Sequence, residues 1–322
     1  MVGKAETWFF VSLVAGMKTE RVIADVVSEA FDKLVWPKSM RWGSTRHRWV
    51  RPLHSILCIF NDKIVAGSVG ADDDQVWFGD TTVGHRFMAP ARFAVTGFAD
   101  YVAKLRAAKV VLDPAERKAK ILADANAICA NLGVKLRDDP GLLDEVAGLV
   151  EWPVVYAGAI DAKFMDVPAE VLVTSMRAHQ KYFATSNEDG SLARHFVVVA
   201  NTETDDGGKL VVAGNERVLR ARLSDAKFFW DQDRKTKLAD RLPALEQRVF
   251  HAKLGTVAAK VARIEKLAAL LAPKLGVDPA DATRAARLAK ADLSSGMVGE
   301  FPELQGVMGR HYARHRSEEH TS

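Results

Sequence analysis

An abrupt change of pattern near Gly214 does most to limit the possible folds of this chain. Before this residue, short runs rich in β-branched and aromatic residues alternate with helical patterns. After it, strand signals vanish, and Ala, Leu, Lys, Arg and Glu dominate to the end. A chain of 322 residues also exceeds what one ordinary core serves. The pattern predicts an α+β protein with a mixed domain over residues 1–234 and an all-helical domain over residues 235–315, divided near Arg234.

Turn and capping residues locate the elements of the mixed domain. Asn61 and Asp62 predict a hairpin turn between two β-rich runs, residues 51–60 and 63–69. Asp113 before Pro114 is typical of a helix start, which predicts a long helix over residues 114–131. Other patterns predict a helix over 19–34, strands over 153–157 and 195–200, and a short helix near 169–176. These elements do not form a regular βαβ repeat.

An apolar run, Trp8–Gly16, lies near the start of the chain. It is about half the roughly 20 residues that a membrane-spanning helix needs, and Glu6 before it is atypical of a signal peptide. We therefore expect it to be a buried part of a domain. Cys58 and Cys129 lie far apart in apolar surroundings, which predicts reduced thiols in a cytoplasmic protein.

Two basic clusters are candidates for binding a polyanion. Guanidinium groups match the geometry of phosphates, and indole rings offer stacking faces to unpaired bases. The candidate residues are Arg41, Trp42, Arg46, Arg48 and Arg51 in the first cluster, and Arg217, Arg220 and Arg222 in the second. A structural alternative remains open for both clusters: the tryptophans belong to the core, and the arginines pair with nearby carboxylates such as Glu216.

The sequence contains no complete catalytic constellation. It has no Gly-x-Ser-x-Gly nucleophile motif, and Gly207-Gly208-Lys209 lacks the spacing of a phosphate-binding loop. His311 and His315 lie one helical turn apart and could chelate a metal, but a solvated helix end explains them better. We therefore predict no catalytic residue, no metal site and no cofactor bound by this chain itself.

Several segments, taken together and in order, resemble the beta subunit of the bacterial two-subunit glycyl-tRNA synthetase. They are distributed over residues 3–315, which makes the resemblance more specific than any single motif. The segments are Trp36–Gly43, Arg51–His54, Gly84–Met88, Leu149–Val154, Gln180–Phe183, Gly214–Leu223, Lys253–Thr256 and Glu300–Gly309.

The resemblance implies a tRNA-binding subunit of a class II ligase that attaches glycine to tRNA(Gly). The chemistry, and with it ATP and magnesium, would belong to an alpha subunit, so that this chain alone would be inactive. The first domain would be similar to the phenylalanyl-tRNA synthetase beta chain and the second to HD domains. Both ends of the family's chain would be cut, and residues 316–322 would be a non-native tail.

The metal-binding pair of an HD hydrolase would fall on Ala291 and Asp292, where the histidine is missing. The resemblance therefore implies a degenerate scaffold, with no catalysis by His251 or Asp292. Two alternatives remain open: a structural scaffold for the alpha subunit with little tRNA contact in this segment, and a degenerate HD-type hydrolase.

Overall fold

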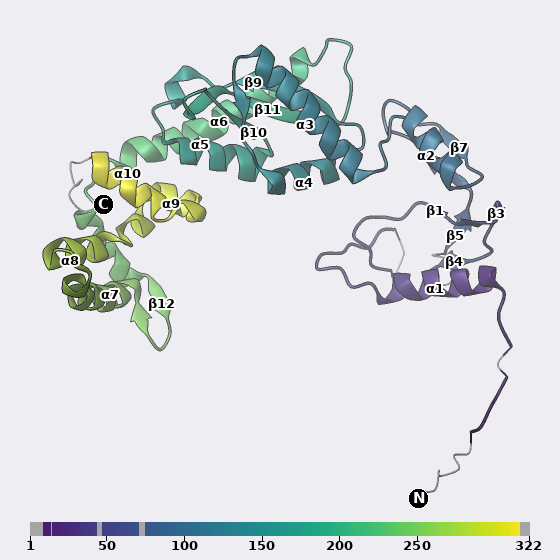
Figure 1. The fold of residues 1–322 in the computed structure, drawn as a ribbon, viewed down its shortest axis with the longest axis horizontal. Helices are drawn as coiled ribbons and strands as arrows, with labels where there is room; N and C mark the ends of the chain where they lie inside the picture. The colour runs from purple at the N-terminus through teal and green to yellow at the C-terminus, as the bar shows by residue number, and fades with distance from the viewer. Residues whose placement is uncertain (1–8, 14, 44–46, 71–74, 316–322) are drawn as a thin grey trace, which may run out of the picture. The chain divides into compact units, whose positions relative to one another are not determined.

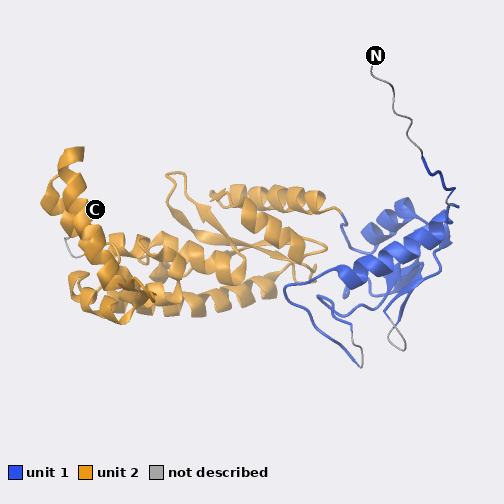
Figure 2. Ribbon diagram, turned by 90° about the horizontal axis from the view of Figure 1, so that it is seen from below, with its two compact units in different colours: residues 1–112 blue, residues 113–322 orange. Residues whose placement is uncertain are grey.

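The computed structural model describes residues 9–13, 15–43, 47–70 and 75–315. The chain forms two compact units, residues 1–112 and 113–322 (Figures 1 and 2). The border between the units thus lies far before Arg234, and the second unit contains both a sheet and the helical region that follows it.

Unit 1 combines two helices with short strands. The strands are β1 (Ile56–Leu57), β2 (Ile59–Phe60), β3 (Lys63–Ile64), β4 (Ser68–Val69), β5 (Val76–Gly79), β6 (Thr81–Val83) and β7 (Arg92–Ala94), and the helices are α1 (Thr19–Lys33) and α2 (Phe98–Ala107). Strand β5 lies between β1 and β4, parallel to β1 and antiparallel to β4. The predicted hairpin is confirmed, since β2 and β3 pair across Asn61 and Asp62, both of which have positive φ.

The core of unit 1 is small. Its cluster beneath α1 holds Val65, Val69 and Phe78 as buried residues, and α1 covers them with Ile23 and Val27 among others. The apolar run expected to be buried is instead exposed in its described part: Phe9, Phe10, Val11 and Leu13 are each at least 82% exposed, so that prediction is wrong there. Helical spacing lets α1 cover this core with one of its faces, whereas residues 9–13 do not belong to this cluster.

Unit 2 begins with a helix that starts as predicted. The Asp113 carboxylate accepts a hydrogen bond from the Ala115 amide at 2.8 Å and caps α3 (Pro114–Asn131). Next come β8 (Lys135–Leu136), α4 (Pro140–Leu149), β9 (Val154–Ala159), α5 (Ala169–Ser175), β10 (Phe183–Ser186), β11 (Leu192–Ala200) and α6 (Lys209–Asp233). The strands form one antiparallel sheet in the order β8-β10-β11-β9.

Alternation along β11 shows how this sheet is covered on both faces. Val197 points into a core shared with α3 and α4, whereas Phe196 and Val198 point into a core shared with α5 and α6. Figure 1 shows α3 and α4 beside the labelled strands. Cys129 is buried in the first of these cores and Cys58 is half-buried in unit 1; both are free, and burial raises the pKa of each thiol.

The rest of unit 2 is mainly helical. Its elements are a 3-10 segment (Ala239–Gln247), β12 (Val249–His251), β13 (Gly255–Thr256), α7 (Val257–Leu271), α8 (Pro279–Leu288), α9 (Gly296–Glu300) and α10 (Val307–His315), with short 3-10 turns between them. The hairpin of β12 and β13 corrects the expectation of a purely helical region. Within the described residues, no helix is both long and apolar enough to span a bilayer.

The border expected near Arg234 lies inside one continuous core. Leu219, Leu223 and Trp230 of α6 belong to the same cluster as Met297 and Tyr312 from the last helices. Because both sides of Arg234 share this core, the chain does not divide there. The change from strand to helix patterns marks a change of secondary structure within unit 2.

Asp233, the last residue of α6, joins this region through a buried carboxylate. It accepts hydrogen bonds from the amides of Gly296 at 2.9 Å and Met297 at 2.8 Å, and from the Tyr312 hydroxyl at 2.9 Å. Arg241 forms an ion pair with it at 3.2 Å, and both side chains are less than a tenth exposed. This single carboxylate therefore connects the end of α6 to α9, α10 and the 3-10 segment.

Candidate nucleic-acid interface

The segment Gly214–Leu223 lies in α6, and several of its side chains fix the helix to the sheet. Asn215 accepts a hydrogen bond from the Tyr182 hydroxyl at 2.5 Å. The Glu216 carboxylate accepts one from the Ala159 amide at 2.8 Å, at the end of edge strand β9. Leu219 and Leu223 are buried beneath the helix. These contacts leave Arg217, Arg220 and Arg222 exposed.

Cations from two other segments join these arginines. The Arg220 Nε lies 3.9 Å from Asp161 Oδ2, and the Lys163 Nζ lies 3.6 Å from the same atom. The Arg194 Nε donates to the Ile160 carbonyl at 3.3 Å. Arg217 lies almost one helical turn before Arg220, on an adjacent face as predicted. We call Lys163, Arg194, Arg217 and Arg220 the basic patch.

The basic patch keeps exposed positive charge. The Lys163 backbone amide, and then the charges of Lys163 and Arg220, lower the pKa of Asp161, so this carboxylate stays ionised near neutral pH. Lys163 and Arg220 are both more than half exposed, and ion pairs this exposed are weak. With Glu216 bonded to the sheet, one carboxylate faces several cations, so the patch can bind phosphates.

Lys163 and Arg194 are absent from the candidates chosen by sequence. Each is isolated along the chain from other cations, and only the pairing of β9 with β11 brings them together. Arg222, by contrast, follows Arg220 by two residues and therefore points to the other flank of α6, since each residue advances the helix by roughly 100°. The structure thus groups two of the three predicted arginines of this cluster.

The first predicted cluster lies in unit 1. Met40 and Trp49 form an antiparallel bridge, so Arg41 and Arg48 each lie next to one of the two bridged residues. Both are exposed, as is Arg51, whose Nη1 donates to the Val50 carbonyl at 2.8 Å. Arg46 lies outside the described residues. This loop therefore presents a second group of cations.

The tryptophans of this cluster divide between two roles. Trp49 stacks on Phe31 with ring centroids 4.5 Å apart, and Trp36 meets Trp49 edge-on at 5.1 Å, which agrees with the structural alternative. Trp42 is half-buried, and no ring contact to it is found among the described residues. Of the cluster's tryptophans, Trp42 is therefore the one that stays a candidate for stacking on a base.

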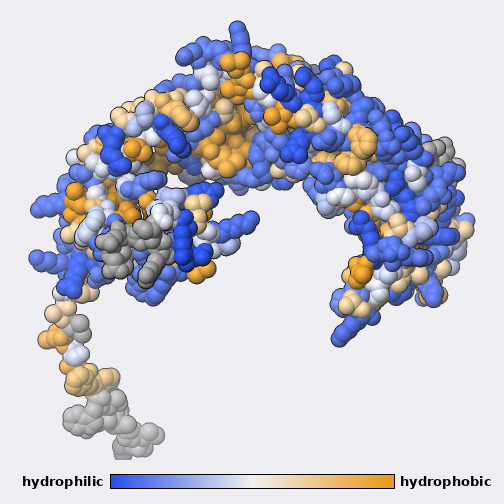
Figure 3. Space-filling view, turned by 180° about the vertical axis from the view of Figure 1, so that it is seen from behind, coloured by the Kyte–Doolittle hydropathy of each residue, from blue (hydrophilic) through white to orange (hydrophobic). Residues whose placement is uncertain are grey.

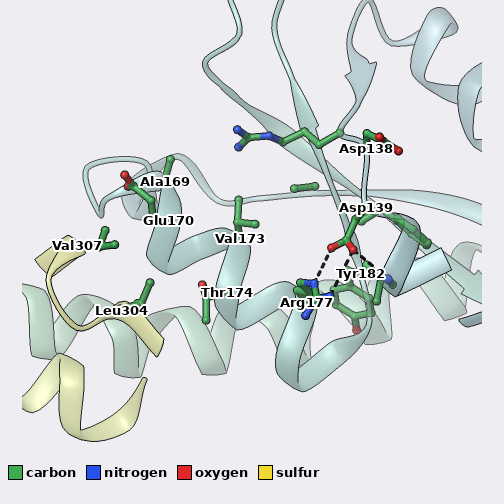
Figure 4. Close-up of a pocket in the computed structure, with 14 residues that line it drawn as sticks. Asp138, Asp139, Ala169, Glu170, Val173, Thr174, Arg177, Tyr182, Leu304 and Val307 are labelled. Atoms are coloured by element: carbon green, nitrogen blue, oxygen red, sulfur yellow. Dashed lines mark hydrogen bonds and ion pairs between the residues drawn. The ribbon is translucent and has the colours of Figure 1, made fainter. Parts of the chain in front are cut away.

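A pocket of about 550 Å³ lies in unit 2 (Figure 4). Ala169, Glu170 and Val173 of α5 form one wall, and Leu304 and Val307 of the C-terminal segment lie across from them (Figure 4). The pocket is the size of a small-molecule site. Three of its charged side chains are already paired: Asp139 with Arg177, and Glu170 with residues outside the lining.

Asp139 receives two hydrogen bonds from Arg177, at 2.6 and 3.4 Å, and one from the Leu142 amide at the start of α4. Burial alone would raise the pKa of Asp139, but these bonds outweigh it and hold that pKa below its usual value. Glu170 likewise contacts Arg310 at 2.6 Å and His311 at 3.0 Å. The paired carboxylates connect helices, and their arrangement does not resemble a nucleophile with its base.

The two residues considered for an HD-type metal site, His251 and Asp292, have separate structural roles. His251 is exposed on the β12 hairpin, and its Nδ1 accepts a hydrogen bond from the Lys253 amide. Asp292 is buried, and its Oδ2 accepts from the amides of Gly306 and Gly309, so it orders the turn before α10. Among the described residues, no group of three or more His, Cys, Asp or Glu side chains could hold a metal ion.

Most of the face seen in Figure 3 is hydrophilic, with hydrophobic residues gathered in separate patches between the charged ones. Exposed hydrophobic patches mark contact surfaces when they are large and contiguous. The charged basic patch and the exposed apolar side chains therefore suit different kinds of binding partner.

Comparisons with a family model and with known proteins agree on one family. The family model described as "Glycyl-tRNA synthetase beta subunit" matches residues 1–321. The chain is similar to the glycine–tRNA ligase beta subunit of Rhodospirillum centenum, with 52% identity over an alignment 335 residues long, gaps included, which covers 97% of this chain and 47% of the relative. Its similarity to the same subunit of Ruegeria sp. is 52% identity (97% and 46% covered), and to that of Paracoccus denitrificans 50% (96% and 46%). The chain spans about half the length of these curated relatives.

Proposed function

Because the chain belongs to the glycyl-tRNA synthetase beta subunit family, we propose that it contributes tRNA-binding surface to a glycine–tRNA ligase. The observation that carries this proposal is the convergence of Lys163, Arg194 and Arg220 around Ile160 and Asp161, with Arg217 beside them. Cations that meet from three segments, and that stay exposed, fit a phosphate backbone.

We propose further that the ligase reaction takes place on an alpha subunit, which would supply the ATP and magnesium sites, and that the assembly acts on tRNA(Gly) in the cytoplasm. On this view the beta chain is inactive alone. The sheet region of unit 2 would correspond to the part that resembles the phenylalanyl-tRNA synthetase beta chain. The helical region would be a degenerate HD-like scaffold, which is supported by the structural role of Asp292.

The test is tRNA binding by the complete enzyme over a series of salt concentrations. The variant replaces the four residues of the basic patch by glutamine, which keeps a polar, unbranched side chain and removes the charge. Each lost phosphate contact should lower the slope of log Kd against log salt by roughly one. We expect weaker binding with a distinctly shallower slope, and an unchanged slope would refute the assignment of this patch.

Arg222→Gln is the matched control, because it removes one arginine from the same helix on the other flank. It should leave the slope nearly unchanged. Arg41→Gln with Arg48→Gln tests the loop in unit 1 separately. Glycine-dependent charging of tRNA, measured with and without the beta subunit, tests the wider proposal: charging that persists without it would contradict the assigned role.

A further inference from the structure

A second pocket, of about 410 Å³, lies in unit 1, where α1 ends and the chain continues toward the first basic cluster. Its size suits a small ligand or a single nucleotide. Three ring side chains, Phe31, Trp36 and His47, and three polar ones, Asp32, Ser39 and Arg48, line it together with two aliphatic residues. We call it the α1 pocket.

The rings of the α1 pocket are held in place by their neighbours. Phe31 and His47 have ring centroids 5.7 Å apart, and Phe31 stacks on Trp49 at 4.5 Å. Trp36 precedes the first basic cluster; it meets Trp49 edge-on at 5.1 Å, and it is only half-buried, so part of its ring faces the pocket. Aromatic and histidine rings are the surfaces on which proteins stack unpaired RNA bases.

The polar groups of the α1 pocket carry opposite charges. Asp32 adds a carboxylate in the last turn of α1, at the negative end of the helix dipole. Arg48 adds a guanidinium, and both side chains are exposed. Neither of them has an ion pair or a side-chain hydrogen bond with a described residue. The pocket therefore offers a ligand one acceptor group and one cation beside its rings.

A nucleotide matches this combination of groups. Its base is flat, and in cytosine, adenine and guanine it carries an amino group that a carboxylate accepts, while its phosphate suits a guanidinium. Lys38, Arg41 and Arg51 are also exposed nearby in the sequence, and no described carboxylate pairs with them. A cationic side chain of a protein would suit Asp32 but would be repelled by this surplus of positive charge. An aliphatic side chain would leave both Asp32 and Arg48 without a partner.

We propose that the α1 pocket binds one unpaired nucleotide of the RNA. The base lies against Trp36 and His47, its amino group donates to the Asp32 carboxylate, and its phosphate contacts Arg48. This inference rests on the proposed function, because it takes tRNA as the ligand. It adds a site in unit 1 that recognises a base, whereas the basic patch consists of cations that contact phosphates.

The test measures the affinity of the complete beta subunit for two single-stranded RNA probes, hexacytidylate and hexauridylate, by fluorescence anisotropy. The two bases have similar sizes, but cytosine presents an amino group where uracil presents a carbonyl oxygen. The four glutamines in place of the basic patch serve as the background, so that its cations do not contribute. We expect the Kd for hexacytidylate to be at least about fivefold lower, because the uracil oxygen would face the Asp32 carboxylate.

Asp32→Asn should remove most of this preference, because an amide can donate to uracil as well as accept from cytosine. The matched control is Asp25→Asn, which changes an exposed aspartate two turns earlier on the same side of α1, outside the lining of the pocket. It should leave the preference unchanged. Both aspartates are exposed, so the fold should stay intact, which circular dichroism checks.

Arg48→Gln tests the phosphate contact separately. It should weaken the binding of both probes alike and lower the slope of log Kd against log salt by roughly 0.7, the value for one contact with a single strand. An unchanged slope would contradict the role of Arg48.

Two further results would overturn the proposal. One is equal affinity for the two probes, or a preference that Asp32→Asn leaves as large as Asp25→Asn does. The other is a subunit that binds tRNA in its wild-type form but binds neither probe in the variant background; another part of the subunit then fills the α1 pocket, and the proposed function stands. If the wild-type subunit does not bind tRNA at all, the proposed function fails as well, and this outcome needs no variant.

Discussion

Replacement of Asp233 by alanine removes the carboxylate at which α6, α9, α10 and the 3-10 segment meet. The amides of Gly296 and Met297 lose their cap, and the Tyr312 hydroxyl loses its acceptor. The Arg241 guanidinium stays buried, although it still donates to the Asp233 backbone carbonyl at 2.7 Å. This variant therefore combines several losses in one place.

The magnitude follows from the kinds of contact. A helix cap contributes about 1 kcal/mol, and a hydrogen bond to a charged group about 1.5–3 kcal/mol. Removal of one partner from a buried ion pair costs about 3–5 kcal/mol in total, because the other charge is left uncompensated. These effects overlap, so we expect Asp233→Ala to lower the free energy of unfolding by about 3–5 kcal/mol.

Urea denaturation followed by far-ultraviolet circular dichroism measures this loss. The matched control is Asp231→Ala, two residues earlier in α6, whose carboxylate forms surface ion pairs with Lys227 and Arg234. Pairs of that kind contribute about 0–1 kcal/mol. A loss for Asp233→Ala no larger than that of the control would refute the view that this carboxylate holds the helices together.

Two further changes test the packing of the sheet region. Gly158→Ala should lower the free energy of unfolding by about 1–3 kcal/mol, because its Cβ would lie 2.4 Å from the Phe196 ring; an unchanged melting temperature would mean that the ring can move aside. Burial raises the pKa of Tyr182 to about 12, so the folded state holds this proton more tightly than the unfolded state. Its contribution to stability is therefore complete below pH about 10 and is lost as the pH rises through about 12. Ultraviolet titration should show a late phenol that Tyr182→Phe removes, and a Tyr182 that ionises near its ordinary pKa of about 10 would contradict its burial.

Local signals in the sequence predicted the structure correctly where one or two residues decide it. Asp113 and Pro114 start α3 because capping involves only neighbouring groups, and Asn61 and Asp62 make a turn because both accept positive φ. The prediction for the apolar run at the start was wrong, since burial depends on a partner surface that a local pattern does not contain.

The residues of the candidate site could likewise be predicted only in part. Arg217 and Arg220 could be predicted, because helical spacing alone puts them side by side. Lys163 and Arg194 could not, because their meeting depends on the register between β9 and β11.

The continuous core beneath α6 decides which parts of these proteins can be exchanged. A chimaera that takes residues 235–315 from a relative, but keeps its own α6, would bring unmatched side chains against Leu223 and Trp230. It would also replace Arg241 and Tyr312, the partners of Asp233, by residues of another chain. The same core also takes Leu172 from α5 and Phe196 from β11, so a recombination point at Lys209, where α6 starts, would divide it as well, and these buried surfaces stay matched only when unit 2 is exchanged as a whole.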